Sequence, residues 1–422
     1  MEVKNMINKQ INEFTLQYSQ IWWNTDKQHA SLTNKNDYWQ KRKKEKETDE
    51  FIKAFVGYIE SFPEQKEQRV LWKERVQDLI NEFTAKSDLI SKEDKKILLD
   101  QGLPKITEQF VKEARIFNPN MKIEDIGQAM RNVWIMNIIQ MLLNKKSEFT
   151  QAIFGYSMLY PYTDNYLDDT EISKEEKVEI SNRFEKRLKG EAIEANNSYE
   201  ESLFELINRI EGQYSRAQYP EVFQSLLGIH YGQKKSLLQQ GRNSCPYDTD
   251  ILGISIEKGG ISVLADAYLV NGKLTKEEAN FFFGYGVLLQ ICDDLQDASE
   301  DLKNNHMTII SQIAKKWPLD NITNGLINFT LNLIDSAECF NCENLVELKD
   351  LIRKNCLQLI LFAVAKNKGL YSRKYFKEVE NYFPYRTRYM NGFYKRLKKK
   401  YSNIQESYGG MATEEIIMYA IS

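Results

Sequence analysis

Residues 281–297 read Phe281-Phe282-Phe283-Gly284-Tyr285-Gly286-Val287-Leu288-Leu289-Gln290-Ile291-Cys292-Asp293-Asp294-Leu295-Gln296-Asp297. Residues 281–292 carry no charge, whereas three of the five residues that follow are aspartates. A run of this kind can be buried on all sides as a helix, but carboxylates at its end are costly to bury without partners. The stretch therefore predicts a core helix whose last turn carries an unusual concentration of negative charge.

The rest of the chain also shows the spacing of amphipathic helices. Ile126, Met130, Val133, Trp134 and Ile138 recur every few residues on one helical face, and similar stripes continue to the C-terminus. The chain has 20 Gly and 8 Pro, too few for the turns of a many-stranded β sandwich or barrel. No segment combines sustained alternating polarity with hairpin signals. We therefore expect an all-α protein.

Composition and charge exclude several classes of protein. In the 422-residue chain, 57 Lys and Arg balance 60 Asp and Glu, so the basic excess of a nucleic-acid binder is missing. No apolar run approaches the roughly 20 residues that a membrane span needs, and the first residues lack the apolar segment of a secretory signal. Five cysteines, a small and odd number, favour free thiols in a reducing compartment. We expect a cytoplasmic protein that binds no nucleic acid and has no transmembrane segment.

Two pairs of aspartates end apolar runs of the predicted helices. Asp164 and Asp168 follow an aromatic run, and Asp293 and Asp297 follow the charge-free stretch described above. Residues four apart share one helical face, where like charges cost roughly 0.2–0.5 kcal/mol. Mg²⁺ would supply the missing positive charge, because it is typically held by one or two carboxylates together with phosphate oxygens.

A solvated acidic helix end is the simpler explanation for a single pair of this kind. Two pairs, each behind an aromatic run without charge, favour a shared cation site instead. If the two helices face each other across a cleft, ions held between them would bind a diphosphate group.

These motifs resemble those of the isoprenyl diphosphate synthase and class I terpene synthase superfamily. Residues 293–297, with Gly286 and Leu289-Gln290-Ile291 ahead of them, are similar to the second aspartate-rich motif of that superfamily, DDxxD after a G…FQ stretch. Residues 164–168 resemble the first DDxxD motif with Asn in its second position. Lys258 stands 35 residues before Asp293, where the family carries a Lys-Thr pair, and Arg131 falls near the family's arginine segment. The resemblance covers about residues 120–400.

The resemblance implies a fold and a set of site residues. The fold would be an isoprenoid-synthase helical bundle around a central cavity over residues 111–422, with residues 1–110 as a helical N-terminal extension packed on it. Asp164, Asp168 and Asp293 would be catalytic and, together with Asp297, would hold three Mg²⁺ ions. The diphosphate group of a prenyl diphosphate substrate is expected to contact Arg131, Lys258, His306, Arg388 and Tyr389.

The prenyl chain would lie along the helices that carry the aspartates. Steps of one turn back from the two motifs lead to side chains that can surround a carbocation, which aromatic ring faces stabilise by about 0.5–2 kcal/mol. The predicted substrate pocket consists of Tyr156, Tyr160, Phe282, Tyr285, Leu289 and Gln290. Ordinary core packing would account for about half of these aromatic residues.

The resemblance leaves more than one function open. Chain-elongating members carry GGKRxRP, whose basic residues bind the second diphosphate, whereas residues 127–134 contain one arginine. This departure and the N-terminal region make the chain more similar to bacterial class I terpene synthases of the large-terpene type. That similarity implies a Mg-dependent cyclase, a lyase that ionises a linear prenyl diphosphate and releases diphosphate with a terpene hydrocarbon or alcohol.

Two alternatives stay open beside the cyclase. One is a prenyltransferase that condenses an allylic diphosphate with isopentenyl diphosphate. The other is a helical scaffold or partner subunit without chemistry. The resemblance also allows a homodimer. The substrate's chain length and the product skeleton depend on the shape of the cavity and do not follow from the motifs.

Overall fold

The computed structural model describes residues 2–28, 32–86, 97, 101–169, 171–240, 248–314, 316–401 and 407–421. The prediction of an all-α protein is confirmed, because within these ranges the strands amount to one short hairpin. The elements are α1 (Glu2–Asn24), α2 (Tyr38–Glu60), α3 (Lys66–Lys86), α5 (Leu103–Phe117), α6 (Ile123–Leu142), α7 (Gln151–Asp168), α8 (Lys174–Leu188), α9 (Ser198–Gln213), α10 (Pro220–Ser236), η1 (Leu237–Gln239), α11 (Ile251–Asn271), α12 (Lys276–Gln296), α13 (Ala298–Asn304), α14 (Ile309–Ala314), α15 (Asp320–Asp335), α16 (Leu345–Lys366), η2 (Lys368–Leu370), α17 (Arg373–Val379), η3 (Glu380–Tyr382), α18 (Thr387–Tyr401), β1 (Ser407–Tyr408), β2 (Met411–Ala412) and α19 (Thr413–Ile421).

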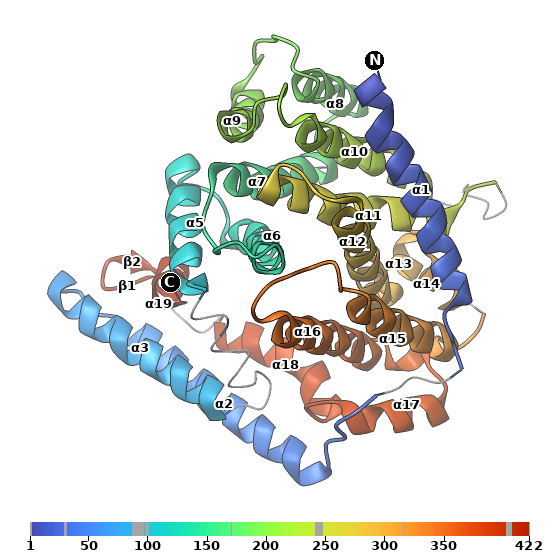
Figure 1. Cartoon of the computed structure of the whole chain (residues 1–422). Coiled ribbons are helices and arrows are strands. Elements are labelled where there is room, and N and C mark those ends of the chain that lie inside the picture. The colour runs from blue at the N-terminus through green and yellow to red at the C-terminus, as the bar shows by residue number, and fades with distance from the viewer. Residues whose placement is uncertain are drawn as a thin grey trace.

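Helices α11 and α12 form the centre of the main core (Figure 1). Helix α12 begins at a capping box between Thr275 and Glu278, and most of its length is buried, as the charge-free stretch predicts. The two helices touch backbone to backbone at Gly259 and Gly286. A Cβ atom at Gly286 would lie 2.1 Å from the carbonyl oxygen of Gly259, so this crossing requires glycine.

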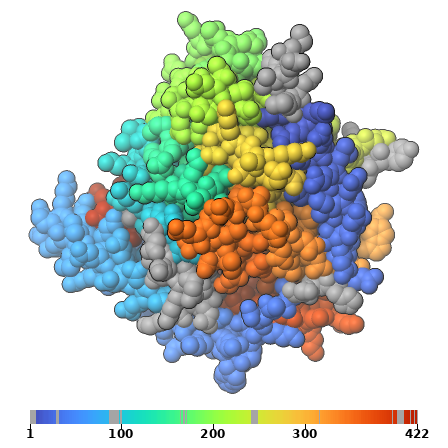
Figure 2. Space-filling model, in the orientation of Figure 1, coloured from blue at the N-terminus to red at the C-terminus, as the bar shows by residue number. Residues whose placement is uncertain are grey.

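The other helices of the main core surround this central pair. Helices α1, α6, α7 and α10 pack against α11, whereas α15 and α16 pack against α12. Helix α1 lies along the outside of the bundle in the space-filling view (Figure 2). It is anchored by aromatic contacts, since Tyr18 stacks on Phe283 with 5.8 Å between ring centroids and Trp22 meets Phe329 at 5.9 Å. The first helix is therefore a structural part of the main core.

A smaller core joins α2 and α3 to the C-terminal helix α19. Helices α2 and α3 form a hairpin, and α19 packs against it together with the β1–β2 hairpin. The predicted division between residues 110 and 111 falls inside α5 (Leu103–Phe117). The division into an N-terminal extension of residues 1–110 packed on a catalytic domain of residues 111–422 stays a prediction, as does the isoprenoid-synthase arrangement of the helices around a central cavity.

Among the described residues, none of the helices is both long enough and apolar enough to cross a bilayer.

Candidate functional site

The C-terminal end of α12 brings together four aspartates of the second motif region. Asp293 and Asp294 lie in the last turn of α12, Asp297 caps the helix, and Asp301 follows on α13. Asp293, Asp297 and Asp301 are spaced by four residues, and each of the first two raises the pKa of Asp301 through its negative charge. We did not expect Asp301 from the sequence, although it extends the same four-residue spacing that marked Asp293 and Asp297.

Asp293 is solvent-accessible but lies among several charged groups. Desolvation by the surrounding helices raises the pKa of its carboxyl group, and the neighbouring Asp297 raises it further. Lys258 on α11, Arg131 on α6 and Lys366 on α16 lower that pKa, in this order of effect. The structure thus places two of the predicted diphosphate-binding residues, Lys258 and Arg131, in the electrostatic neighbourhood of Asp293.

Asp294 is the most deeply buried carboxylate of the group, with 5% of the residue exposed. Burial raises its pKa to about 7, against a hydrogen bond from Gln290 that lowers it. Gln290 Nε2 donates to Asp294 Oδ1 at 2.8 Å, because the two residues are one turn apart. Asp294 Oδ2 is buried without a hydrogen-bond partner in the described part of the chain. This oxygen is therefore available to a cation or a bound water.

An open hollow of about 370 Å³ adjoins these carboxylates. We call it the acidic hollow; its lining residues are Gln240, Asp297, Glu300, Asp301, Asn304 and His306. Burial raises the pKa of Asp301 to about 7, whereas burial and the nearby Lys258 lower the pKa of His306. The predicted site residue His306 thus lies beside the second motif, and Met307 after it is tied to Gln239 by a backbone hydrogen bond of 2.8 Å.

Helix α16 contributes a lysine that the sequence analysis did not single out. Lys366 Nζ lies 3.0 Å from Asp297 Oδ1. The next residue, Asn367, holds the end of α16 in place. The side-chain amide of Asn367 donates to the carbonyl oxygens of Leu295 and Gln296 at 2.9 and 3.1 Å. The end of α16 is therefore locked to the end of α12, and Lys366 partly neutralises the second motif.

The first aspartate motif ends α7. Its Asn165 donates to Asp125 Oδ1 at the beginning of α6, at 3.0 Å. Arg131, six residues further along α6, is one of the residues that lower the pKa of Asp293. Helix α6 therefore contacts one motif and lies near the other. The side chains of Asp164 and Asp168 lie outside the described residues, so the expected facing of the two motifs stays a prediction.

The predicted pocket residues fall into two groups. Tyr156 and Tyr160 line a small pocket between α7, α8 and α10. Phe282 and Tyr285 are buried in the main core, where Phe282 packs against Phe340 at 5.2 Å between centroids. Leu289 is half-buried and also packs against this core. The lining of the small pocket includes neither Phe282 nor Tyr285 nor Leu289.

A buried carboxyl group lies between the two groups of predicted pocket residues. Asp266 on α11 has 1% of its surface exposed and accepts a hydrogen bond of 3.2 Å from Asn132. Burial raises its pKa well above the usual value, although the hydrogen bond from Asn132 lowers it. Its position also raises the pKa of Tyr156 and of Tyr285, after the larger effect of burial. The sequence signal was present, since Asp266 is the single charged residue between Gly259 and Val270.

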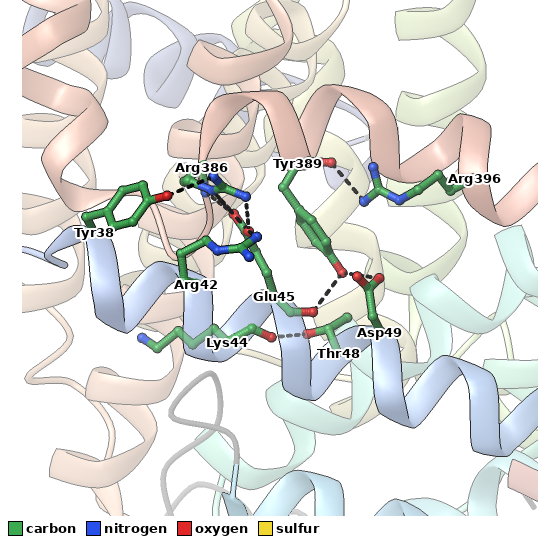
Figure 3. A network of polar contacts seen from close by, with 9 residues as sticks. All are labelled: Tyr38, Arg42, Lys44, Glu45, Thr48, Asp49, Arg386, Tyr389 and Arg396. Atoms are coloured by element: carbon green, nitrogen blue, oxygen red, sulfur yellow. Dashed lines mark hydrogen bonds and ion pairs between the residues drawn. The ribbon is translucent and has the colours of Figure 1, made fainter.

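Arg388 and Tyr389 lie in the first turn of α18. Figure 3 shows Tyr389 in a polar network between α18 and α2, where its hydroxyl donates to Asp49 Oδ1 at 2.9 Å. In the same network Arg386 forms an ion pair of 2.6 Å with the buried Glu45. Arg388 is exposed. The structure therefore does not bring Tyr389 into the group around Asp293.

The chemistry of the donor groups fits a hard cation such as Mg²⁺. All the acidic groups offer oxygen ligands, and several have raised pKa values, first because burial desolvates them and then because neighbouring carboxylates repel their charge. Within the described residues, no three Asp, Glu, His or Cys side chains are already arranged as ligands of one ion. Lys366 and Gln290 occupy two of these carboxylates instead.

Comparisons of the chain with family models, with curated proteins and with solved structures found no match.

Proposed function

We propose that the protein is a Mg-dependent class I terpene synthase that ionises a linear prenyl diphosphate. The observation that carries the proposal is the group at the end of α12. Asp293, Asp297 and Asp301 lie in reach of one another's charge there, with Lys258 and Arg131 close enough to lower the pKa of Asp293. Carboxylates and cations side by side at one end of an apolar bundle suit a metal-bound diphosphate.

The aspartates of the two motifs would bind the metal ions. Asp293, Asp297 and Asp301, together with Asp164 and Asp168 of the first motif, would hold the ions. Bound Mg²⁺ would supply Lewis-acid stabilisation of the departing diphosphate.

The cationic residues would act on the other side of the diphosphate. Lys258 and Arg131 would donate hydrogen bonds to its oxygens, and such bonds strengthen as negative charge develops on the leaving group. His306, half-buried beside the acidic hollow, would be a neutral donor to the same group at pH 7, since burial lowers its pKa.

The apolar part of the bundle would receive the prenyl chain. The aromatic side chains that the sequence singled out would line its path, and their ring faces would stabilise the allylic cation left after ionisation. Tyr156 is the residue that best links the two regions, because it lines the small pocket and also lies beside Asp266.

The test uses purified full-length protein with Mg²⁺ and linear prenyl diphosphates of increasing length, from two to five isoprene units. Diphosphate release and extracted products are measured with and without isopentenyl diphosphate. We expect one of the substrates alone to give diphosphate and a terpene hydrocarbon or alcohol. Longer diphosphates that form only with isopentenyl diphosphate would identify a prenyltransferase. No release from any substrate in Mg²⁺ would overturn the enzyme proposal in both forms.

A further inference from the structure

The small pocket beside α7 contains a histidine that neither motif includes. The pocket measures about 40 Å³ and is lined by residues of α7, α8 and α10. Its lining includes Tyr156, Tyr160 and Thr163 from α7, Phe184 from α8 and His230 from α10. Apart from His230, the walls are mainly apolar or aromatic. A single titratable imidazole in such a wall needs a physical explanation.

His230 is buried without the hydrogen bonding that usually compensates burial. The residue is 6% exposed, and its Nε2 atom has no hydrogen-bond partner in the described part of the chain. The cost of such a buried polar atom is about 1–3 kcal/mol. Its ring meets the ring of Phe184 edge-on, with 5.6 Å between centroids. Packing alone would be served better by an apolar side chain at this position.

Burial and a neighbouring positive charge keep the His230 imidazole unprotonated at neutral pH. Burial lowers its pKa to about 4, and the positive charge of Lys234 lowers it further against the opposing effect of Glu185. Glu185 Oε2 lies 3.6 Å from His230 Nε2. Lys189, Lys234 and Tyr231 hold Glu185 as a carboxylate, and their hydrogen bonds lower its pKa to about 2. The Glu185 carboxylate would therefore stabilise a positive charge on the imidazole ring.

The position of the pocket relates this imidazole to the first aspartate motif. Tyr156, Tyr160 and Thr163 follow α7 toward Asp164, which is the next residue after Thr163. A chain whose diphosphate is held at that end of α7 would extend along these residues into the pocket. Its volume has room for roughly three water-sized groups, which is close to the size of one isopropylidene end.

We propose that His230 is the base that ends the reaction by taking a proton from the carbocation. This inference rests on the proposed function, since it needs a cation formed by loss of diphosphate. The C–H bond next to the cationic carbon breaks, its electron pair forms the new C=C bond, and the proton forms an N–H bond at Nε2. The positive charge moves to the imidazolium, beside the Glu185 carboxylate. The proton then leaves through Glu185, which reaches the surface residues Lys234 and Tyr231.

The experiment measures how products divide per diphosphate released. For His230→Gln and His230→Leu, we expect the yield of the wild-type alkene per diphosphate to fall at least about tenfold. Loss of a general base typically costs about 100-fold or more, so tenfold is a lower bound. The substrate that no longer gives the wild-type alkene should give alcohols or alkenes with a displaced double bond. Glu185→Gln should give a smaller change in the same direction, because it removes the charge that stabilises the imidazolium.

Ser225→Ala is the matched control, because Ser225 is buried on the same helix and bonds only to the carbonyl of Val222 among the described contacts. Its product ratio should equal that of wild type. If His230→Leu does not fold, His230→Gln makes the same test with a polar side chain of similar size. An unchanged alkene yield per diphosphate in the folded histidine variant overturns the assignment of His230 alone. If the wild-type protein releases no diphosphate, the proposed function fails as well.

Discussion

The ammonium group of Lys366 lies 3.0 Å from Asp297 Oδ1, so a lysine of the chain itself supplies positive charge where the sequence predicts a metal. The pair is partly exposed, with 56% of the lysine side chain and 44% of the aspartate side chain accessible to solvent. A contact of this kind contributes little to stability. Its main effect is on the electrostatic potential at the end of α12, where it competes with a divalent ion for the same carboxylate.

Removal of Lys366 should therefore strengthen Mg²⁺ binding. For Lys366→Gln, we expect the Mg²⁺ concentration that gives half of the thermal stabilisation to fall about fivefold, because one nearby positive charge is lost. Thermal unfolding over a MgCl₂ titration measures this. Lys374→Gln, an exposed lysine on α17, is the control. A half-saturating concentration that stays the same or rises in Lys366→Gln would contradict the competition.

Asp293 should be essential for ionisation and dispensable for folding. Asp293→Asn keeps the size of the side chain and removes its charge, so we expect diphosphate release to fall at least about 100-fold, which corresponds to roughly 2.7 kcal/mol of barrier. The melting temperature without metal should stay equal or rise, since repulsion with Asp297 and Asp301 is relieved. The control is Asp335→Asn, a surface residue paired with Arg353. Wild-type turnover in Asp293→Asn would exclude a metal site here.

Burial of Asp294 makes the stability of the metal-free protein depend on pH. An unfolded aspartate ionises near pH 4, whereas the pKa of Asp294 in the folded protein is about 7. Between these values the folded state binds more protons than the unfolded state, so stability falls as the pH rises from about 4 to 7. Asp294→Asn should reduce this loss and should melt higher than wild type at pH 7.5 in EDTA. Equal melting temperatures of the two proteins at pH 7.5 would show that Asp294 is not destabilised by its charge.

The ion pair between Glu45 and Arg386 should hold α18 to α2. Glu45 is 2% exposed, and although burial opposes it, hydrogen bonds from Arg386 lower its pKa below the usual value. Its stabilisation is present above pH 4.5 and is lost as the pH falls through the lowered pKa. For Glu45→Gln at pH 7, we expect a loss of about 3 kcal/mol in urea unfolding. Glu50→Gln, on the exposed side of α2, is the control and should change stability by less than about 0.5 kcal/mol.

Helix α1 should be indispensable to the main core. Trp22 is 1% exposed and packs on Phe329 of α15. Trp22→Ala should therefore lower the unfolding free energy by about 3–5 kcal/mol. Leu16→Ala on the same helix serves for comparison, since Leu16 is 66% exposed and its loss should cost little. If both substitutions have the same small effect, α1 is not part of the cooperative core.

Several parts of the site could be predicted because they depend on local spacing. The run from Phe281 to Cys292 predicted a buried helix, and the aspartates after it predicted an acidic helix end. Lys258 and Arg131 act on the charge of Asp293, and their contact with a diphosphate stays a prediction. Asp301 was missed although it continues the spacing of four, and Asp266 was missed although it is a lone charge in an apolar helix.

Other features could not be predicted, because they join residues far apart in the chain. Lys366 reaches Asp297 because Asn367 ties α16 to the end of α12. Tyr389 contacts Asp49 because α18 lies against α2. Local periodicity carries no information about which helices become neighbours, since that choice depends on how all the apolar faces pack together.

The sequence by itself determined that the chain is helical, that α12 is buried and that negative charge gathers at its end, because these properties follow from side-chain spacing and polarity. The tertiary structure alone decided which cations lie beside those carboxylates, that Asp294 keeps an unpaired oxygen and that His230 enters the pocket beside α7. These features arise from contacts between separate helices, and the free energy of such contacts is set by the packing of the whole bundle.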